Sequence, residues 1–128
     1  MALQIKKGEK VKKKPTVYVV TETGNHNITP AMEFGEIVVI LPPRAQITFS
    51  VVPTINRIKR ALAKFTDDDY LLFIGDPVAI AAVSSVAASR NHGRYKCLKW
   101  DKFERRYIPI QIDLYPQKGE LDESDEYI

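Results

Sequence analysis

The order of apolar and polar residues divides the middle of the chain into strands and helices. Segments rich in β-branched or unbroken apolar residues predict strands, and Pro and Gly clusters mark where they end. A short helical turn is expected at 29–34, where Thr29 and Pro30 could begin it and Gly35 ends it. The expected strands are 16–23, 36–41, a short third strand at 46–51, a buried strand at 70–74, and 94–100.

Two longer helices are expected. In 54–65, one apolar stripe has helical spacing and three cations fall on nearly the opposite side, so this helix lies on a core with a basic outer face. In 77–90, valine and isoleucine alternate with alanine and serine, which predicts a helix buried on most of its surface. The stripe of the first helix is Ile55, Ile58, Leu62 and Phe65, and its cations are Arg57, Arg60 and Lys64.

The segment 106–114 alternates isoleucines with polar residues, which indicates a half-buried antiparallel strand. Pro109 places this strand at a sheet edge or at a bulge. The fold class is therefore α/β (α+β-like): a single domain, a mixed β-sheet, two main helices and a C-terminal antiparallel hairpin.

Composition excludes several classes of protein. The chain has 128 residues, 45% hydrophobic and 27% charged, which suits one globular domain. The single cysteine, Cys97, forbids an intrachain disulfide and favours a reducing compartment. Two histidines are too few for a zinc site, and no apolar run has the length of a membrane helix. We expect a cytoplasmic protein with no metal, no cofactor and no membrane partner.

Charge is distributed unevenly between the two ends of the chain. Residues 1–15 hold six lysines and one acid, whereas residues 116–128 hold five acids and one lysine. Such segments cannot build a core and are expected to be flexible. The expected organisation is a basic tail at 1–15, a globular domain at 16–115 and an acidic tail at 116–128.

The motif Gly75-Asp76-Pro77 resembles the start of a nucleotide site, because an apolar strand leads to a glycine and then to a helix. A phosphate needs free backbone N–H groups there, yet Pro77 lacks one and Asp76 would repel the anion. Asp at the N-cap followed by Pro is what a stable helix start requires. We therefore interpret this motif as a structural turn. A magnesium site at Asp76 is the weaker alternative, since the acids at 67–69, expected to form a solvated turn, lie at the opposite end of the strand.

The segment 90–107 carries seven basic residues interleaved with four aromatic ones. Cations neutralise phosphates and exposed aromatic rings stack on bases, so this ribbon could bind nucleic acid. The competing interpretation is a solvated edge strand whose charges prevent aggregation. The candidate nucleic-acid-binding residues, from the basic tail, the first long helix and the ribbon, are Lys12, Lys13, Lys14, Arg57, Arg60, Lys64, Arg94, Tyr95, Lys96, Lys99, Trp100, Lys102, Phe103, Arg105, Arg106 and Tyr107.

The acidic tail, GELDESDEYI, resembles in character the C-terminal tails of single-stranded DNA-binding proteins, which recruit partners and compete with DNA for the basic surface. The rest of the chain departs from that family, because an OB barrel has no place for the helix at 77–90. An ordinary solvated tail is an equal alternative.

With DDDYLLFIGDPVAIAAV and RYKCLKWDKFERRYIPIQIDL in view, the chain resembles a family of small proteins encoded by tailed bacteriophages. The resemblance covers about residues 18–114 and rests on Gly75-Asp76-Pro77, Lys99-Trp100-Asp101 and Arg105-Arg106-Tyr107. It implies the cytoplasm of an infected bacterium, but it brings no activity and no catalytic residue with it.

Three functions follow as hypotheses. The first is a non-catalytic accessory protein that binds nucleic acid, with DNA expected and single-stranded DNA as one form of it. The second is a protein-binding module that modulates a host or phage enzyme through its acidic tail or an edge strand, with oligomers permitted. The third, and weakest, is a small nucleotide-binding enzyme centred on Asp76.

Overall fold

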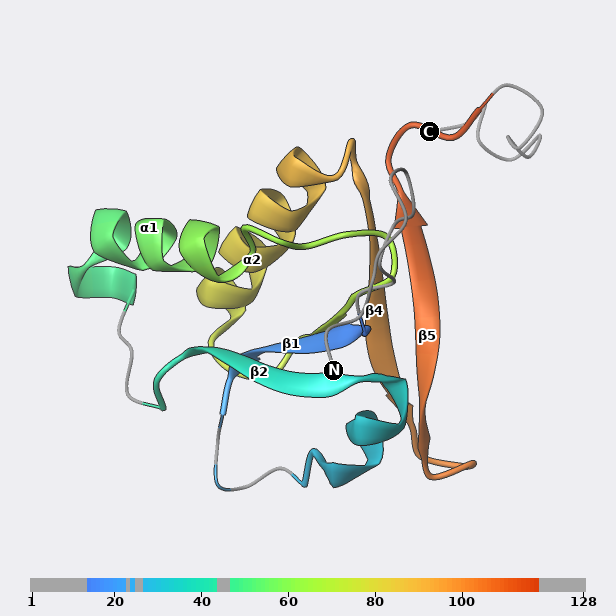
Figure 1. Ribbon diagram of the computed structural model, residues 1–128. Helices are drawn as coiled ribbons and strands as arrows, with labels where there is room; N and C mark the ends of the chain where they lie inside the picture. Colours follow the sequence, from blue (N-terminus) through green and yellow to red (C-terminus); the bar gives the residue numbers. More distant parts are fainter. Residues whose placement is uncertain (1–13, 23, 25–26, 44–46, 118–128) are drawn as a thin grey trace, which may run out of the picture.

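The computed structural model describes residues 14–22, 24, 27–43 and 47–117. Its centre is one five-stranded sheet with the strand order β2-β1-β3-β4-β5, in which the first four strands are parallel and β5 runs antiparallel to β4 (Figure 1). The expected mixed sheet with a C-terminal hairpin is confirmed. The strands are β1 (Thr16–Thr21), β2 (Glu36–Leu41), β3 (Tyr70–Leu72), β4 (Arg94–Asp101) and β5 (Arg106–Asp113).

The direction of each connection explains which face each helix covers. From β1 the chain passes through the 3-10 helix η1 (Thr29–Phe34) to β2 on one side of β1. From β2 it returns across β1 through α1 (Val51–Ala61) to β3, and then continues through α2 (Pro77–Arg90) to β4. Since crossovers between parallel strands are right-handed, the reversal puts η1 on one face and both α-helices on the other, as Figure 1 shows.

Each face of the sheet has its own hydrophobic core. Under α1 and α2, the side chains of Tyr18, Val20 and Leu71 pack against the helices. On the opposite face, Val17 and Val19 pack with residues of η1 and with the hairpin. All six residues of β1 are buried, because this strand lies inside the sheet and is covered on both sides.

α1 has the predicted amphipathic form but spans Val51–Ala61, so it both begins and ends earlier than the predicted 54–65, and Leu62 and Phe65 follow it. Ile58, Leu62 and Phe65 are buried as the stripe requires, and Ile55 is half-buried. The expected strand at 46–51 is wrong: Ile47–Phe49 is a short 3-10 helix, η2, and Ser50 already caps α1, while residue 46 lies outside the described residues. Alternation over a few residues cannot separate a strand from a tight helical turn when no partner strand is in reach.

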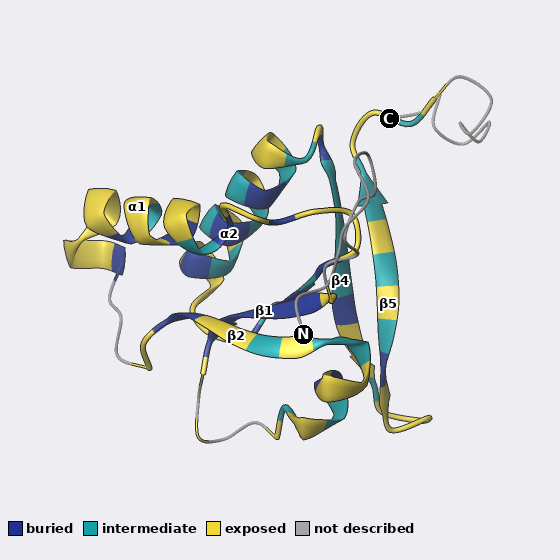
Figure 2. Cartoon of the chain, in the orientation of Figure 1, coloured by how far each residue is buried: buried dark blue, intermediate teal, exposed yellow. Residues whose placement is uncertain are grey.

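α2 begins and ends at the predicted residues but is buried less than predicted. Only one stripe is buried, formed by Ala79, Val83 and Ala87, whereas Val78 and Ser85 are exposed (Figure 2). Helix 77–90 is therefore packed on one side like an ordinary surface helix, and its outer side carries small residues instead of charged ones.

The acidic run before β3 is not a solvated turn throughout, as had been expected. Asp67 and Asp68 are exposed, but Asp69 is completely buried. Its carboxylate accepts hydrogen bonds from the backbone N–H of Thr16 and from that of Thr66, each at 2.9 Å. Asp69 thus joins the first residue of β1 to the loop that leads into β3.

The Gly75-Asp76-Pro77 turn has the predicted capping geometry. The Asp76 carboxylate accepts a hydrogen bond from the backbone N–H of Ala79 at 3.0 Å, and Pro77 is the first residue of α2. The carboxylate thus occupies the helix start that a phosphate would need. In the part of the chain that the structure describes, no helix is long and apolar enough to cross a membrane.

Candidate nucleic-acid interface

The β4–β5 hairpin carries most of the candidate residues, and its register divides them between the two faces of the sheet. Trp100 is paired with Tyr107, and Lys99 with Ile108. Because successive side chains of a strand point to opposite faces, Trp100 shares its face with Leu98, on the side of η1. Lys99 shares the other face with Cys97, on the side of the α-helices. The basic residues of the ribbon therefore do not form one flat cationic face.

The two strands are joined by the loop 102–105, which Asp101 organises. The Asp101 carboxylate accepts hydrogen bonds from the backbone N–H groups of Phe103 at 2.9 Å and Glu104 at 3.3 Å. This local bonding is the usual role of an aspartate at a turn. Arg105 closes the loop with a φ of 52°, in the left-handed region. Phe103 lies in this loop and is 97% exposed.

Some cations of the ribbon are engaged by the protein itself. Arg94 forms an ion pair with Asp67 at 3.3 Å, and the Lys96 ammonium lies 4.2 Å from the centre of the Tyr70 ring. Arg106 pairs with Glu104 beside the loop. These contacts lower the charge that Arg94 and Arg106 can offer to a ligand.

Of the four remaining cations, Arg90 ends α2 and donates a hydrogen bond to the backbone carbonyl of Lys59 at 3.2 Å. The other three lie close to the loop and make no ion pair with any described residue: they are Lys99, Lys102 and Arg105. Trp100, which is 41% exposed, and Phe103 stand among them. The end of the hairpin thus combines unpaired positive charge with exposed aromatic rings.

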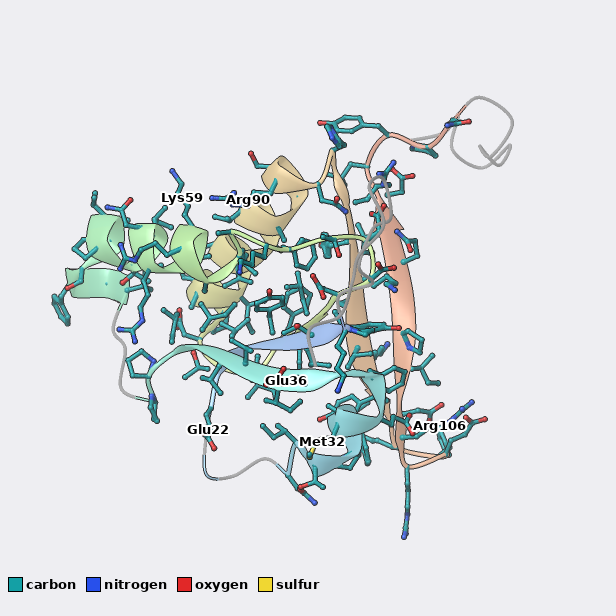
Figure 3. The ribbon with its side chains drawn as sticks, in the orientation of Figure 1. Glu22, Met32, Glu36, Lys59, Arg90 and Arg106 are labelled. Atoms are coloured by element: carbon teal, nitrogen blue, oxygen red, sulfur yellow. The ribbon has the colours of Figure 1, made fainter. Side chains whose placement is uncertain are left out.

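The other candidate cations lie elsewhere. α1, which bears Arg57 and Arg60, lies at the opposite end of the molecule from the hairpin loop (Figure 1), and Lys64 belongs to the turn that follows α1. Figure 3 shows the same separation between Lys59 of α1 and Arg106 of the hairpin. Lys14 is exposed just before β1, while Lys12 and Lys13 lie outside the described residues. The structure therefore separates the α1 cations from the hairpin cations.

Aromatic packing stabilises the part of the hairpin next to its loop. The rings of Trp100 and Tyr107 meet edge to face with their centres 5.0 Å apart, and Tyr107 is buried. Burial raises the pKa of the Tyr107 phenol and that of the Cys97 thiol, so both groups stay protonated at neutral pH. Tyr95, whose pKa burial also raises, packs against Phe73 near the start of the hairpin.

An open cavity of about 720 Å³ lies beside the hairpin, and sequence reasoning missed part of its lining. Asn27, just before η1, Pro30, in η1, and Phe73, just after β3, are far from the hairpin in sequence, and no local motif marks them. These residues lie beside β4 only in the folded chain. The complete lining is Asn27, Pro30, Leu72, Phe73, Ile74, Cys97, Leu98, Lys99, Trp100, Tyr107 and Ile110.

The described residues assemble no metal centre: nowhere among them do three His, Cys, Asp or Glu side chains come close enough to hold an ion.

Fold and surface together define a class: a small α/β protein with a mixed sheet and a basic, aromatic hairpin.

The chain belongs to the Phage Pam3 gp32-like protein family, whose model matches residues 15–114. The expected resemblance to a phage protein family is thereby confirmed. The match includes the whole sheet and both helices but not the segments 1–14 and 115–128. No curated protein and no solved structure matches the chain.

Proposed function

We propose that this phage protein is a non-catalytic accessory protein that binds single-stranded nucleic acid through the end of its β4–β5 hairpin. The observation that carries the proposal is the grouping of exposed Phe103 and Trp100 with Lys99, Lys102 and Arg105, cations that form no ion pair with any described residue. Aromatic faces stack on unpaired bases of any sequence, and cations bind the phosphates between them. The site of action is the cytoplasm of the infected host cell.

The terminal segments have supporting roles in this proposal. The basic tail 1–15 adds non-specific attraction for phosphates, and the acidic tail 116–128 competes with nucleic acid for the cations. Both tails lie largely outside the family match. In this proposal they change the affinity for nucleic acid, whereas the hairpin makes the contacts with bases and phosphates.

Fluorescence anisotropy with labelled single-stranded and duplex oligonucleotides, at several salt concentrations, tests the proposal. A triple variant of the hairpin, Lys99→Gln, Lys102→Gln and Arg105→Gln, is compared with a triple variant of α1, Arg57→Gln, Lys59→Gln and Arg60→Gln. Both remove three positive charges, from opposite ends of the molecule. The hairpin variant should reduce the slope of log affinity against log salt by about 2, since each lost contact with a single strand accounts for about 0.7.

The α1 variant controls for net charge. Equal losses in both variants would mean that binding depends on overall charge and not on the hairpin. A chain ending at Gln117 keeps every described residue and should bind more tightly than the full chain if the acidic segment competes. Absence of binding by the full chain and by the shortened chain at low salt would overturn the proposed function.

A second candidate function rests on the free edge of the sheet. β5 is an edge strand of eight residues, and a strand from a host or phage protein could pair with it. Pro109 removes one backbone donor from this edge. Gln111→Pro would remove a second one, and loss of a captured partner in this variant would support strand pairing. Retention of the partner would contradict it.

A further inference from the structure

The cavity beside the hairpin exists because β3 stops where β4 continues. β3 pairs with β4 only at Tyr70 with Lys96 and at Leu71 with Cys97. The backbone N–H of Ile74 then donates to the carbonyl of Leu72 at 3.1 Å, a tight turn after which the chain no longer pairs with β4, although the carbonyl of Ile74 still accepts the N–H of Thr21 at 3.0 Å. From Leu98 onward β4 has no strand partner on the β3 side within the described residues. The space of a continued β3 is left as the cavity.

This cavity opens at the place where doubly wound sheets bind ligands. Such sheets bind outside the carboxyl ends of the parallel strands, near the point where the connections change face. In this chain the change occurs between β1, which leads to η1, and β3, which leads to α2. Asn27 and Pro30, from the connection after β1, form one wall, and the end of β3 forms another.

The chemistry of the lining suits a flat aromatic ring that carries hydrogen-bonding groups on its edge. Most of the wall is apolar or aromatic, with Phe73, Trp100 and Tyr107 among the residues that form it. The volume of about 720 Å³ is that of typical small-molecule pockets, which span about 300–1,000 Å³. The Asn27 amide oxygen already accepts the backbone N–H of Thr29 at 3.1 Å, so the amide NH₂ of Asn27 and the Tyr107 phenol are the groups offered to a base edge.

The Tyr107 hydroxyl is available to a ligand although its residue is only 7% exposed. Among the described residues it makes no hydrogen bond, and no fully buried side-chain oxygen or nitrogen lacks a partner there. The hydroxyl is therefore reached by solvent, and a protonated phenol in an apolar wall is a ready hydrogen-bond donor.

Positive charge lies at one end of the cavity. Lys99 belongs to its lining and also to a second hollow of about 480 Å³, which continues along the hairpin to Lys102 and Phe103. A ligand with a ring in the cavity could extend an anionic group toward Lys99 and further groups toward the loop. Asp101 is the acid of that second hollow, and its carboxylate already accepts two backbone N–H groups.

We propose that the cavity receives the base of a nucleotide whose phosphate lies at Lys99. As a part of a single strand, this nucleotide would anchor one base while its neighbours stack on Trp100 and Phe103, and in that form the inference rests on the proposed function. The same chemistry is offered by a free mononucleotide. Single strand and mononucleotide are therefore separate arms of the test.

Two residues of the lining give a direct readout, because Cys97 is the one cysteine and Trp100 the one tryptophan of the chain. The rate at which a thiol reagent modifies Cys97 in the full chain is measured at alkaline pH, together with the fluorescence of Trp100. The probes are a ten-residue deoxythymidine strand, an abasic strand of the same length and thymidine monophosphate. At saturation, the thymidine strand should slow Cys97 modification about tenfold and quench Trp100, while the abasic strand should not protect Cys97.

A matched pair of variants separates occupation of the cavity from general binding. Ile110→Phe adds volume inside the cavity, whereas Ile112→Phe makes the same change two residues along the same face of β5, outside the lining. We expect Ile110→Phe to weaken binding of the thymidine strand about tenfold and Ile112→Phe to leave it unchanged. Thermal unfolding of both variants checks that each is folded.

Each outcome bears on the two proposals separately. Strand binding by anisotropy without protection of Cys97 overturns the cavity inference and leaves the proposed function standing. Protection by thymidine monophosphate without strand binding supports the cavity and overturns the proposed function. Equal protection by the abasic strand overturns base insertion.

Discussion

The carboxylate of Asp69 accepts a hydrogen bond from the backbone N–H of Thr16 at 2.9 Å, across 53 positions of sequence. Thr16 is the first residue of β1, and its neighbour in the sheet, β3, begins at Tyr70, directly after Asp69. A fully buried carboxylate is stabilised only when its oxygens are bonded, and Asp69 also receives the backbone N–H of Thr66. This one side chain therefore aligns the starts of two adjacent central strands.

Substitution of Asp69 by Asn should reduce the free energy of unfolding by about 2–4 kcal/mol. The amide keeps the shape but turns an N–H group toward a backbone donor, so at least one buried N–H loses its partner. Chemical denaturation measures the loss. Asp68→Asn is the matched control, because Asp68 is the exposed neighbour and its substitution should change stability by less than about 0.5 kcal/mol.

Equal effects of the two substitutions would contradict the role of Asp69. The folded fraction of each variant at 25 °C, followed by far-ultraviolet circular dichroism, distinguishes loss of the fold from loss of stability.

Gly75 should not tolerate alanine. Its φ is +127°, and a Cβ there would lie 2.9 Å from the Thr21 side chain. Strain and contact together should cost about 2–3 kcal/mol, whereas Gly24→Ala, where nothing lies within 4 Å, should be nearly neutral. Thermal unfolding of the two variants makes the comparison. A neutral Gly75→Ala would mean that β1 and β3 separate easily at their carboxyl ends.

Asp76 should behave as a helix cap and not as a catalytic acid. Asp76→Ala removes the acceptor for the N–H of Ala79 and should cost about 1 kcal/mol of stability. Asp76→Ser keeps an acceptor and should restore most of it. The measurement is denaturant unfolding, with nucleic-acid affinity measured beside it. If folded Asp76→Ser bound nucleic acid more weakly than the unchanged protein, Asp76 would have a role in ligand binding and not only in capping.

Asp67 links the end of α2 to the loop before β3 and should give the protein a small acid-sensitive contribution. The hydrogen bond from the Asn91 side chain, at 2.6 Å, and then the Arg94 charge lower the pKa of Asp67 below its ordinary value of 3.8. A lowered carboxyl pKa stabilises the folded state above the unfolded value, and this contribution is lost as the pH falls through the folded value. Because the Asp67 side chain is 59% exposed, it amounts to less than about 1 kcal/mol.

A double-mutant cycle with Asp67→Asn and Asn91→Ala measures this contribution. The coupling energy between the two residues should be present at pH 6 and smaller at pH 3. A coupling that stays constant with pH would show that the charged form of Asp67 is not the one that Asn91 stabilises.

The sequence predicted those elements whose signals are local. Asp76 and Pro77 mark the start of α2, and Pro42 marks the end of β2, so these boundaries are confirmed. The short strand expected at 46–51 is wrong because alternation there has no partner strand to satisfy it. The burial of Asp69 could not be predicted either, since its neighbours in sequence are exposed acids and its partner Thr16 comes from the other end of the domain.

The candidate site was predictable in composition but not in arrangement. Seven cations between residues 90 and 107 were visible in the sequence. Which of them pair with the protein depends on tertiary neighbours, as with Arg94 and Asp67. The cavity beside Lys99 depends on the early end of β3, and no periodicity in a short apolar run marks the residue at which pairing stops.

Phe103 provides the clearest test of what the hairpin loop does. This residue is 97% exposed, so Phe103→Ala should change the free energy of unfolding by less than about 0.5 kcal/mol. If the ring stacks on a base, the same substitution should cost about 1–3 kcal/mol of affinity for a single strand, a loss of roughly 5- to 150-fold. Anisotropy with a labelled single strand measures it.

The matched control is Phe49→Ala, because Phe49 is also 82% exposed but lies in η2 beside the start of α1, at the other end of the molecule. It should leave affinity unchanged, and Phe103→Tyr should retain most of it because the ring remains. An equal loss in Phe103→Ala and Phe49→Ala would trace the effect to general surface hydrophobicity. If neither changes the affinity, the loop does not stack, and binding depends on charge alone.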